Sequence, residues 1–295
     1  MKKGFKAIGK AAAYFGIYFL MQIVVSSVFS VSLSTKMTME MMAAGEELDM
    51  IAMTEQLTAE IMSRAMEMTL IAGIFTLLVF WLIFIIRKKK FLAEVGIRTI
   101  PVKGILPIAI MAVSFNVVTS VIVSIIPWPQ AWMESYATNS SMIDENSIIA
   151  WITAILMAPI LEEIVFRGLV YTRLKKGFPV VVAALLTSAA FGAAHGTIIW
   201  FIYTFIFSLV LIWVFERFQS LTASILLHMA YNIAGMGLSK LPEGAYVIIW
   251  VLFALSIVGA VVGYRLTCKA SEDIPKLVEM QEETITVLEE ENIEA

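Results

Sequence analysis

Residues 177–215 read GFPVVVAALLTSAAFGAAHGTIIWFIYTFIFSLVLIWVF, a stretch of 39 residues without Asp, Glu, Lys or Arg. A helix needs only ~20 apolar residues to cross the hydrocarbon core of a bilayer, which is ~30 Å thick. One straight helix of this length would overshoot that core, so we expect the stretch to fold back on itself. Gly192 and Gly196 mark the turn, which predicts two spans, over residues 178–195 and 198–215.

The rest of the chain carries further apolar runs of the same kind. Of its 295 residues, 60% are hydrophobic and 15% charged, whereas soluble chains are typically ~45–50% apolar and ~25% charged. The first uncharged run, residues 11–35, is longer than the apolar part of a secretory signal peptide, so it predicts a span and not a cleaved leader. The predicted spans are 11–32, 68–86, 104–126, 148–166, 178–195, 198–215, 220–238 and 245–265. The sequence thus predicts an all-α, polytopic membrane bundle of about eight helices.

Basic residues orient the predicted bundle. They cluster before span one and after spans two, four, six and eight, which places every cluster on one side if eight spans are present. By the positive-inside rule that side is the cytoplasm. We therefore expect a multi-pass protein of the cell membrane, embedded in the lipid bilayer, with cytoplasmic N- and C-termini.

Two segments lie outside the predicted bundle. Residues 36–67 form an external loop with 8 of the 18 methionines, and their acidic, helix-forming composition favours an amphipathic helix on the membrane or over the bundle. A copper site there is disfavoured because no Cys or His accompanies the thioethers. The tail after Ala270 carries nine carboxylates and predicts a solvated extension. We divide the chain into an N-terminal membrane region (1–147), a core (148–238), a last span (239–270) and an acidic tail (271–295).

The first candidate site is Glu162-Glu163-Ile-Val-Phe-Arg167, late in span four. Glu163 and Arg167 are four residues apart, so they share a helix face and can pair. Glu162 points about 100° away and is available for another role. The alternative is that these side chains only reach toward the interface at the helix end. An ionisable residue costs ~2.5–3.5 kcal/mol near the centre of a span, so its presence asks for a reason.

Both histidines of the chain lie inside predicted spans. His195 shares a helix face with Phe191, and taken alone it is more simply explained as a structural residue. His228 and Asn232 project from one face of span seven, where they form either an oxyanion hole or a polar clamp between helices. Together with Glu162 these residues supply a base, a group that orients water and oxyanion donors, which is a sufficient set for hydrolysis.

At these residues the chain resembles the CPBP or Abi family, which contains CaaX prenyl endopeptidases and bacteriocin-processing or immunity proteins. Three motifs match in order: Glu-Glu-x-x-x-Arg at 162–167, Phe-x-x-x-His at 191–195 and His-x-x-x-Asn at 228–232. The resemblance covers about residues 148–238 and implies an intramembrane endopeptidase acting on a lipidated or bacteriocin-like peptide. Its substrate would be membrane-associated. A net charge of -3 gives no support for a nucleic-acid partner, and the oligomeric state stays open.

The resemblance also implies a role for each motif residue. Glu162 would be the general base, and His195 would hold the water. His228 and Asn232 would stabilise the oxyanion, while the Glu163–Arg167 pair keeps Glu162 in position and Phe191 supports the site.

Two questions remain open at this stage. One zinc ion on Glu162, His195 and His228 is an alternative to a metal-free site, although the zinc signature His-Glu-x-x-His is missing. We favour the metal-free version because Asn is a poor zinc ligand and a good oxyanion donor. A non-catalytic immunity protein or transporter is the alternative to an enzyme.

For an upright fifth helix from Phe178, His195 would lie ~25 Å from the cytoplasmic end. Glu162 and His228 would lie ~10–16 Å from it, so a shorter, tilted or re-entrant fifth helix is expected.

Overall fold

The computed structural model describes residues 2–44, 49–143, 147–242 and 244–274, and within these residues the chain is helical without strands. Seven of the described helical segments are long and apolar enough to cross a membrane. They confirm the predicted fold class, a polytopic membrane bundle. The helices are α1 (Lys2–Ala44), α2 (Met50–Ser63), α3 (Ala65–Ile86), α4 (Phe91–Glu94), α5 (Ile105–Ile125), α6 (Gln130–Ser140), α7 (Ile148–Ile152), α8 (Ala158–Glu163), α9 (Thr172–Leu174), α10 (Val180–Ala193), α11 (Ile198–Phe218), α12 (Leu221–Leu238) and α13 (Tyr246–Ala270).

The predicted fifth span, residues 178–195, is shorter in the structure than in the sequence analysis. It forms α10, whose 14 residues cover about 21 Å at 1.5 Å per residue, less than the ~30 Å of a hydrocarbon core. Pro179 precedes the helix in an extended conformation, with φ -55° and ψ 148°. Gly196 has a φ of +82°, which few other residues adopt, and it separates α10 from α11. The predicted turn is therefore present.

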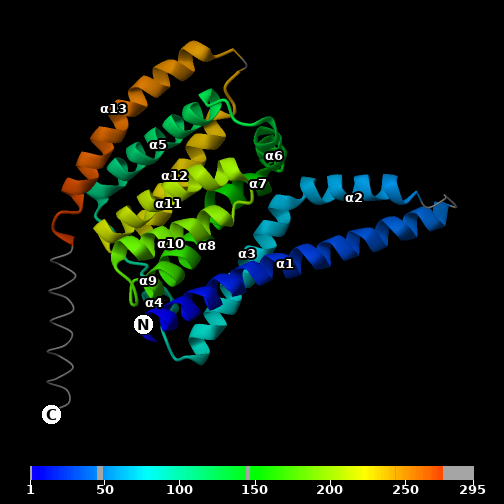
Figure 1. Ribbon diagram of the computed structural model, residues 1–295, viewed down its shortest axis with the longest axis horizontal. Helices are drawn as coiled ribbons and strands as arrows, with labels where there is room; N and C mark the ends of the chain where they lie inside the picture. The colour runs from blue at the N-terminus through cyan, green and yellow to red at the C-terminus, as the bar shows by residue number, and fades with distance from the viewer. Residues whose placement is uncertain (1, 45–48, 144–146, 243, 275–295) are drawn as a thin grey trace. The chain divides into compact units, whose positions relative to one another are not determined.

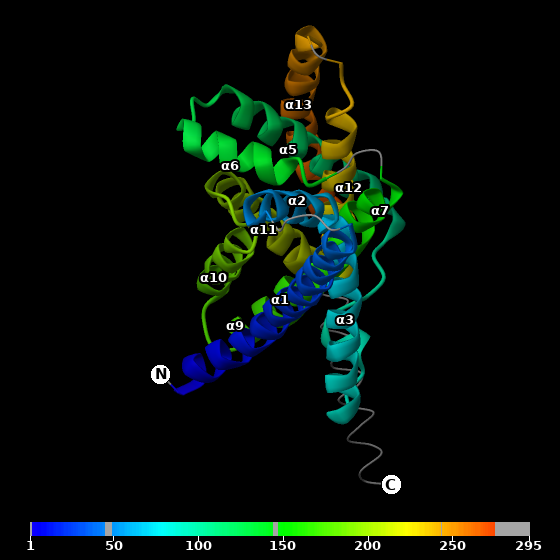
Figure 2. The ribbon, with the colours of Figure 1, turned by 90° about the vertical axis from the view of Figure 1, so that its right-hand side faces the viewer.

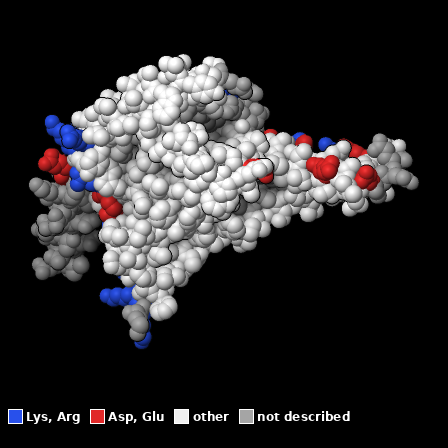
Figure 3. All heavy atoms as spheres, turned by 45° about the horizontal axis from the view of Figure 1, so that its top comes forward, with Lys and Arg blue, Asp and Glu red and all other residues white. Residues whose placement is uncertain are grey.

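The surface is apolar along the spanning helices, as contact with a lipid bilayer requires. Large apolar side chains are exposed along the spanning helices, and Val28 and Val31 on α1 are each 66% exposed. On the face drawn in Figure 3, most atoms belong to uncharged residues. Apolar patches of this extent are not stable against water, so lipid must cover them.

The chain divides into two compact units, which we describe in turn. Unit 1 contains residues 1–91 and 128–202, and unit 2 contains residues 92–127 and 203–295.

Unit 1 is organised around α1, which has 43 residues and is about 64 Å long. It crosses α3, and α2 lies alongside its C-terminal part (Figures 1 and 2). Tyr14 of α1 packs against Phe80 and Phe84 of α3, with ring centroids 5.9 and 6.3 Å apart. Two turns earlier on α3, Gly73 lets the helix approach Leu161, because an added Cβ would lie 3.3 Å from that side chain.

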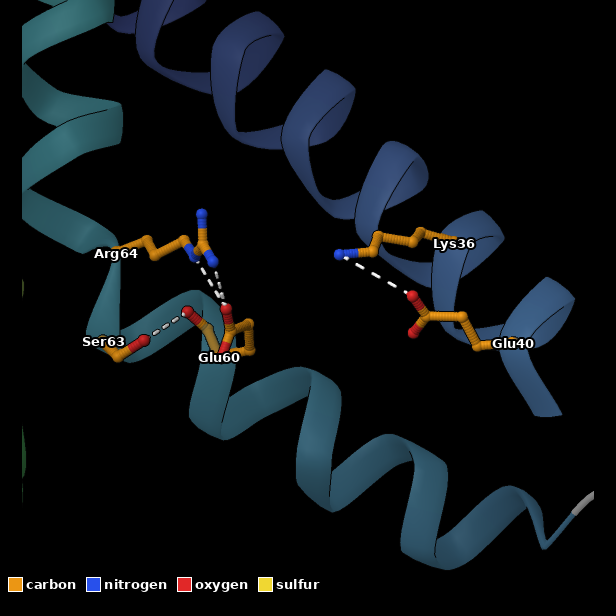
Figure 4. A network of polar contacts seen from close by, with 5 residues as sticks. All are labelled: Lys36, Glu40, Glu60, Ser63 and Arg64. Atoms are coloured by element: carbon orange, nitrogen blue, oxygen red, sulfur yellow. Dashed lines mark hydrogen bonds and ion pairs between the residues drawn. The ribbon is translucent and has the colours of Figure 1, made fainter. Parts of the chain in front are cut away.

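The predicted external segment, residues 36–67, is largely helical, since α1 continues to Ala44 and α2 follows at Met50. Asp49 caps α2 by accepting hydrogen bonds from the backbone N–H groups of Ile51 and Ala52. Figure 4 shows two ion pairs at four-residue spacing on the facing helices. They join Lys36 to Glu40 at 3.8 Å and Arg64 to Glu60 at 2.7 Å. Such exposed pairs contribute only ~0.2–1 kcal/mol each.

Unit 2 is built on α5, which lies beside both α12 and α13 (Figure 1). Small residues allow this close packing. An added Cβ at Gly263 of α13 would lie 2.9 Å from the backbone nitrogen of Met111 on α5. The core of the unit contains Phe207 and Leu211 of α11 and Leu227 of α12, each with at most 1% of its surface exposed. This packing fixes α12, which carries two of the predicted site residues.

Candidate active site

The helical span that carries the Glu-Glu motif is irregular. Between α7 and α9 it contains two π-helical segments, Thr153–Met157 and Ile164–Tyr171. Glu162 and Glu163 lie at the end of α8, directly before the second of them. A π-helix has i→i+5 hydrogen bonds, is rare in proteins, and is often found at functional sites. The irregular backbone therefore falls where the sequence analysis placed the chemistry.

Glu163 and Arg167 form the predicted ion pair. Arg167 Nη1 donates a hydrogen bond to Glu163 Oε1 at 3.0 Å, and neither side chain has any exposed surface. The Arg167 guanidinium also lies 4.4 Å from the centroid of the Phe191 ring, a cation–π contact that joins this span to α10. The pair is thus a buried, fixed element of the site and not an interfacial one.

Glu162 is only partly buried, in contrast to its neighbour Glu163. Its carboxylate interacts electrostatically with Arg167 and with Tyr18, a buried side chain of α1. Tyr18 also packs edge-to-face on Phe166, at 5.9 Å between ring centroids. Sequence reasoning missed Tyr18, although Tyr14 and Tyr18 stand four residues apart on one face of the first span, which was the available signal.

His195 lies in the turn between α10 and α11. Its Nδ1 is 2.7 Å from the backbone oxygen of Phe191, and its ring centroid is 4.7 Å from that of Phe191. A carbonyl oxygen only accepts hydrogen bonds, so Nδ1 carries the proton, and in the neutral ring the lone pair lies on Nε2. Close packing holds the turn in place, since an added Cβ at Gly192 would lie 2.9 Å from the Phe201 ring.

Five of the predicted residues therefore belong to one cluster in unit 1. Glu162 interacts with Arg167, Arg167 pairs with Glu163 and lies over Phe191, and Phe191 anchors His195. The short α10 brings His195 to this cluster in the way that the sequence analysis required. A carboxylate base and an imidazole are the two kinds of group needed to hold and activate a water molecule.

Replacing His195 by Asn should distinguish the role of Nδ1 from the role of Nε2. The Asn amide can still donate to the Phe191 carbonyl, as Nδ1 does, but it has no counterpart of Nε2. We expect H195N to unfold at the wild-type temperature and to lose about 10²–10⁴-fold in peptide cleavage. The matched variant H195Q reaches the Nε2 position and should keep more activity while losing thermal stability. Equal activity of H195N and wild type would contradict a role for Nε2.

Unit 2 supplies the third motif on α12. His228 is 5% exposed, and its ring meets the Phe207 ring edge-to-face at 5.3 Å between centroids. Tyr231 stacks on the same Phe207 ring at 4.0 Å. Asn232 follows His228 at four-residue spacing and is partly buried. The packing of His228 against the unit 2 core makes α12 a rigid support for polar groups.

A further amide of unit 2 lies close to this motif. Asn116 of α5 is 5% exposed, and an added Cβ at Gly235 of α12 would lie 3.0 Å from its Nδ2. Its Oδ1 is buried, and the described residues provide no hydrogen-bond partner for it. The sequence analysis did not identify Asn116, because a single Asn in an apolar span has no motif around it.

The zinc alternative was tested against the donor set. Glu162 and His195 belong to unit 1 and His228 to unit 2. In the part of the chain that the structure describes, no group of three or more His, Cys, Asp or Glu side chains could hold a metal ion. The zinc alternative therefore stays a prediction, and no step below is routed through a metal.

Comparison with known families agrees with the resemblance drawn from the motifs. Residues 144–234 match the family model described as type II CAAX prenyl endopeptidase Rce1-like. The matched segment contains all seven predicted site residues and confirms the resemblance. It gives no support to the metalloprotease or bacteriocin-immunity expectations. No curated protein and no solved structure matches the chain.

Proposed function

We propose that this protein is an intramembrane endopeptidase of the CAAX type, which hydrolyses a peptide bond in a membrane-associated substrate. The observation that carries the proposal is the Glu162-to-His195 cluster of unit 1, which lies within the matched segment and includes a buried ion pair. A clamp between helices would need the Glu163–Arg167 pair alone. It would not need a second, more accessible carboxylate and an imidazole beside that pair.

The proposed reaction begins with a water molecule held by Glu162 and the Nε2 atom of His195. Glu162 takes a proton from this water as its oxygen bonds to the carbonyl carbon of the substrate. The carbonyl oxygen becomes an oxyanion and needs hydrogen-bond donors, which is the role that the family resemblance implies for His228 and Asn232. The C–N bond then breaks, and the proton on Glu162 passes to the leaving nitrogen. The products are one new carboxyl group and one new amine.

Glu163 and Arg167 act in this scheme as positioning residues. The charge of Arg167 is held by Glu163 on one side and by the Phe191 ring on the other. Arg167 can therefore help to position the Glu162 carboxylate without reaching the substrate. Tyr18 of α1 also interacts electrostatically with Glu162.

The CAAX type implies a substrate whose prenylated C-terminal segment reaches the site from the membrane. We propose that cleavage occurs toward the side that carries the basic loops, the cytoplasm by the positive-inside rule, where both termini would also lie.

A reconstituted assay tests this function. The full chain, in lipid vesicles, is given a farnesylated peptide that ends in a CAAX sequence and the same peptide without the farnesyl group. We expect release of the C-terminal tripeptide, detected by mass spectrometry, from the farnesylated peptide only. A positive-control protease shows that the assay detects cleavage. If the protein then cleaves neither peptide, a non-catalytic membrane protein is favoured.

The same assay examines metal dependence. We expect the cleavage rate to be unchanged by a metal chelator, since no step requires a metal. A cleavage rate that falls with the chelator and recovers to its original value on addition of zinc would favour the zinc alternative.

Replacing Asn232 by Asp tests the oxyanion role. The side chains have the same shape, but the carboxylate cannot donate a hydrogen bond and adds negative charge where the oxyanion forms. We expect kcat to fall about 10²–10³-fold, with little change in the affinity for the farnesylated peptide. Binding of the peptide to N232D, measured by fluorescence anisotropy, provides the control. An unchanged kcat would show that Asn232 clamps helices instead.

A further inference from the structure

Three segments of unit 1 are strongly basic. Its residues 2–16, 86–91 and 172–179 contain eleven Lys and Arg residues and no Asp or Glu. These residues are Lys2, Lys3, Lys6, Lys10, Arg87, Lys88, Lys89, Lys90, Arg173, Lys175 and Lys176. The catalytic scheme uses none of them.

The fold brings these three segments together around the first half of α1. Arg87 Nη1 donates a hydrogen bond to the Tyr14 hydroxyl at 2.9 Å. The Arg173 guanidinium lies 5.6 Å from the centroid of the same Tyr14 ring. In Figures 1 and 2 the N-terminus of α1 also lies near α9, which contains Arg173. The Tyr14 side chain of α1 thus contacts basic residues from two other parts of unit 1.

Close packing fixes the start of α1 against the loop before α10. An added Cβ at Gly177 would lie 2.6 Å from Ala7 Cβ and 3.0 Å from the Lys3 carbonyl oxygen. An added Cβ at Gly4 would lie 3.2 Å from the Phe178 ring. A larger residue at Gly177 would push the two segments apart, because it would meet the Ala7 Cβ and the backbone of Lys3, so this close approach depends on Gly177.

An apolar groove of about 330 Å³ runs along this contact and is lined by Gly4, Phe5, Ile8, Gly177 and Phe178. Phe5 is 73% exposed and Ile8 is 44% exposed. Lys3, Lys6 and Lys176 are each next in sequence to a residue of the groove. Three of the eleven basic residues thus flank the groove in sequence, and we call these lysines its rim.

We propose that this groove binds an anionic phospholipid, whose acyl chain lies along Phe5, Ile8 and Phe178 and whose phosphate contacts the lysines. A free inorganic anion would make no use of the groove, and a zwitterionic lipid would not match the net charge of the rim. The positive-inside rule accounts for the sign of the charge but not for the glycine-packed apolar groove between two of the basic segments. The anionic lipids of the cytoplasmic leaflet are attracted to basic segments of this kind, by about fivefold in affinity for each Lys or Arg near the surface.

Native mass spectrometry of the full chain tests the site with equal amounts of dioleoyl phosphatidylglycerol and dioleoyl phosphatidylcholine. We expect the protein to retain phosphatidylglycerol preferentially. The double variant K3Q/K6Q should weaken this binding about 25-fold, from fivefold for each lysine. The control K36Q/R64Q changes the net charge of unit 1 by the same amount outside the groove, at Lys36 of α1 and at Arg64, which follows α2, and it should bind as wild type does.

Two further arms define the ligand. Replacing Phe5 by Ser should weaken phosphatidylglycerol binding, because it removes the apolar part of the site and leaves every charge in place. Inorganic phosphate at millimolar concentration should not displace the lipid. Equal retention of the two lipids, or equal losses in K3Q/K6Q and K36Q/R64Q, would overturn the proposal. Displacement by inorganic phosphate would replace it with a simple anion site. Peptide cleavage is not the readout, so this result is independent of the proposed function.

Discussion

Replacing Arg167 by Leu is expected to destabilise the protein by about 3–5 kcal/mol, the cost of leaving one partner of a buried ion pair alone. Glu163 would keep its carboxylate at a position with 0% exposure and no counter-ion at 3.0 Å. The Phe191 ring would also lose its cation–π contact. Thermal or denaturant unfolding in detergent micelles, followed by circular dichroism or intrinsic fluorescence, measures the loss.

The chain contains a matched control for this prediction. Glu60 and Arg64 form a pair with the same four-residue spacing and a shorter distance of 2.7 Å, but their side chains are 40% and 46% exposed. Replacing Arg64 by Leu should therefore cost less than about 1 kcal/mol. Equal effects of R64L and R167L would contradict the idea that burial gives the Glu163–Arg167 pair its importance.

A double variant separates the structural role of the pair from its catalytic role. Replacing Glu163 by Leu and Arg167 by Met removes both charges together, and such replacements of buried pairs are often neutral or stabilising. We expect E163L/R167M to recover most of the stability that R167L loses. If the pair positions Glu162, the double variant will remain inactive although it is folded. Recovery of both stability and activity would reduce the pair to a structural element.

Replacing Glu162 by Gln is expected to reduce peptide cleavage on the order of 10²–10⁴-fold, the usual contribution of a general base. The Gln side chain has the same size and can still form hydrogen bonds, but it cannot accept a proton from water. Glu162 is only partly buried, so the change should leave the unfolding temperature near that of wild type. The measurement is the cleavage rate of the farnesylated peptide by purified protein.

Two controls accompany E162Q. Its level in the membrane and its affinity for the farnesylated peptide should match those of wild type, which shows that the site is intact. The neighbouring variant E163Q should lower stability as well as activity, because Glu163 is fully buried in its ion pair. Wild-type cleavage by E162Q would exclude Glu162 as the base.

Much of the fold could be predicted from hydropathy alone. Long uncharged runs must become spanning helices, since only a helix satisfies its own backbone hydrogen bonds in lipid. The length of α10 was not predictable in this way. It is set by an extended Pro179 and a left-handed Gly196, while the apolar run itself continues on both sides. The π-helical segments near Glu162 could not be predicted either, because hydropathy carries no information on the spacing of backbone hydrogen bonds.

The candidate site divides along similar lines. The Glu163–Arg167 pair followed from helical spacing, which is a local property of the sequence. The contacts of Arg167 with Phe191 and of Glu162 with Tyr18 join residues far apart in the chain, so they depend on how the helices pack. The tautomer of His195 likewise depends on one hydrogen bond to a backbone oxygen that only a structure reveals.

The most direct test of the hydrolytic mechanism is product analysis by mass spectrometry after cleavage of the farnesylated peptide in water enriched in ¹⁸O. Attack by water activated at Glu162 predicts one ¹⁸O atom in the new C-terminal carboxyl group, an unmodified enzyme at every time point and a rate of product formation about 10²–10⁴-fold lower in E162Q. A peptide covalently attached to the enzyme, or labelled product from E162Q at the wild-type rate, would contradict it.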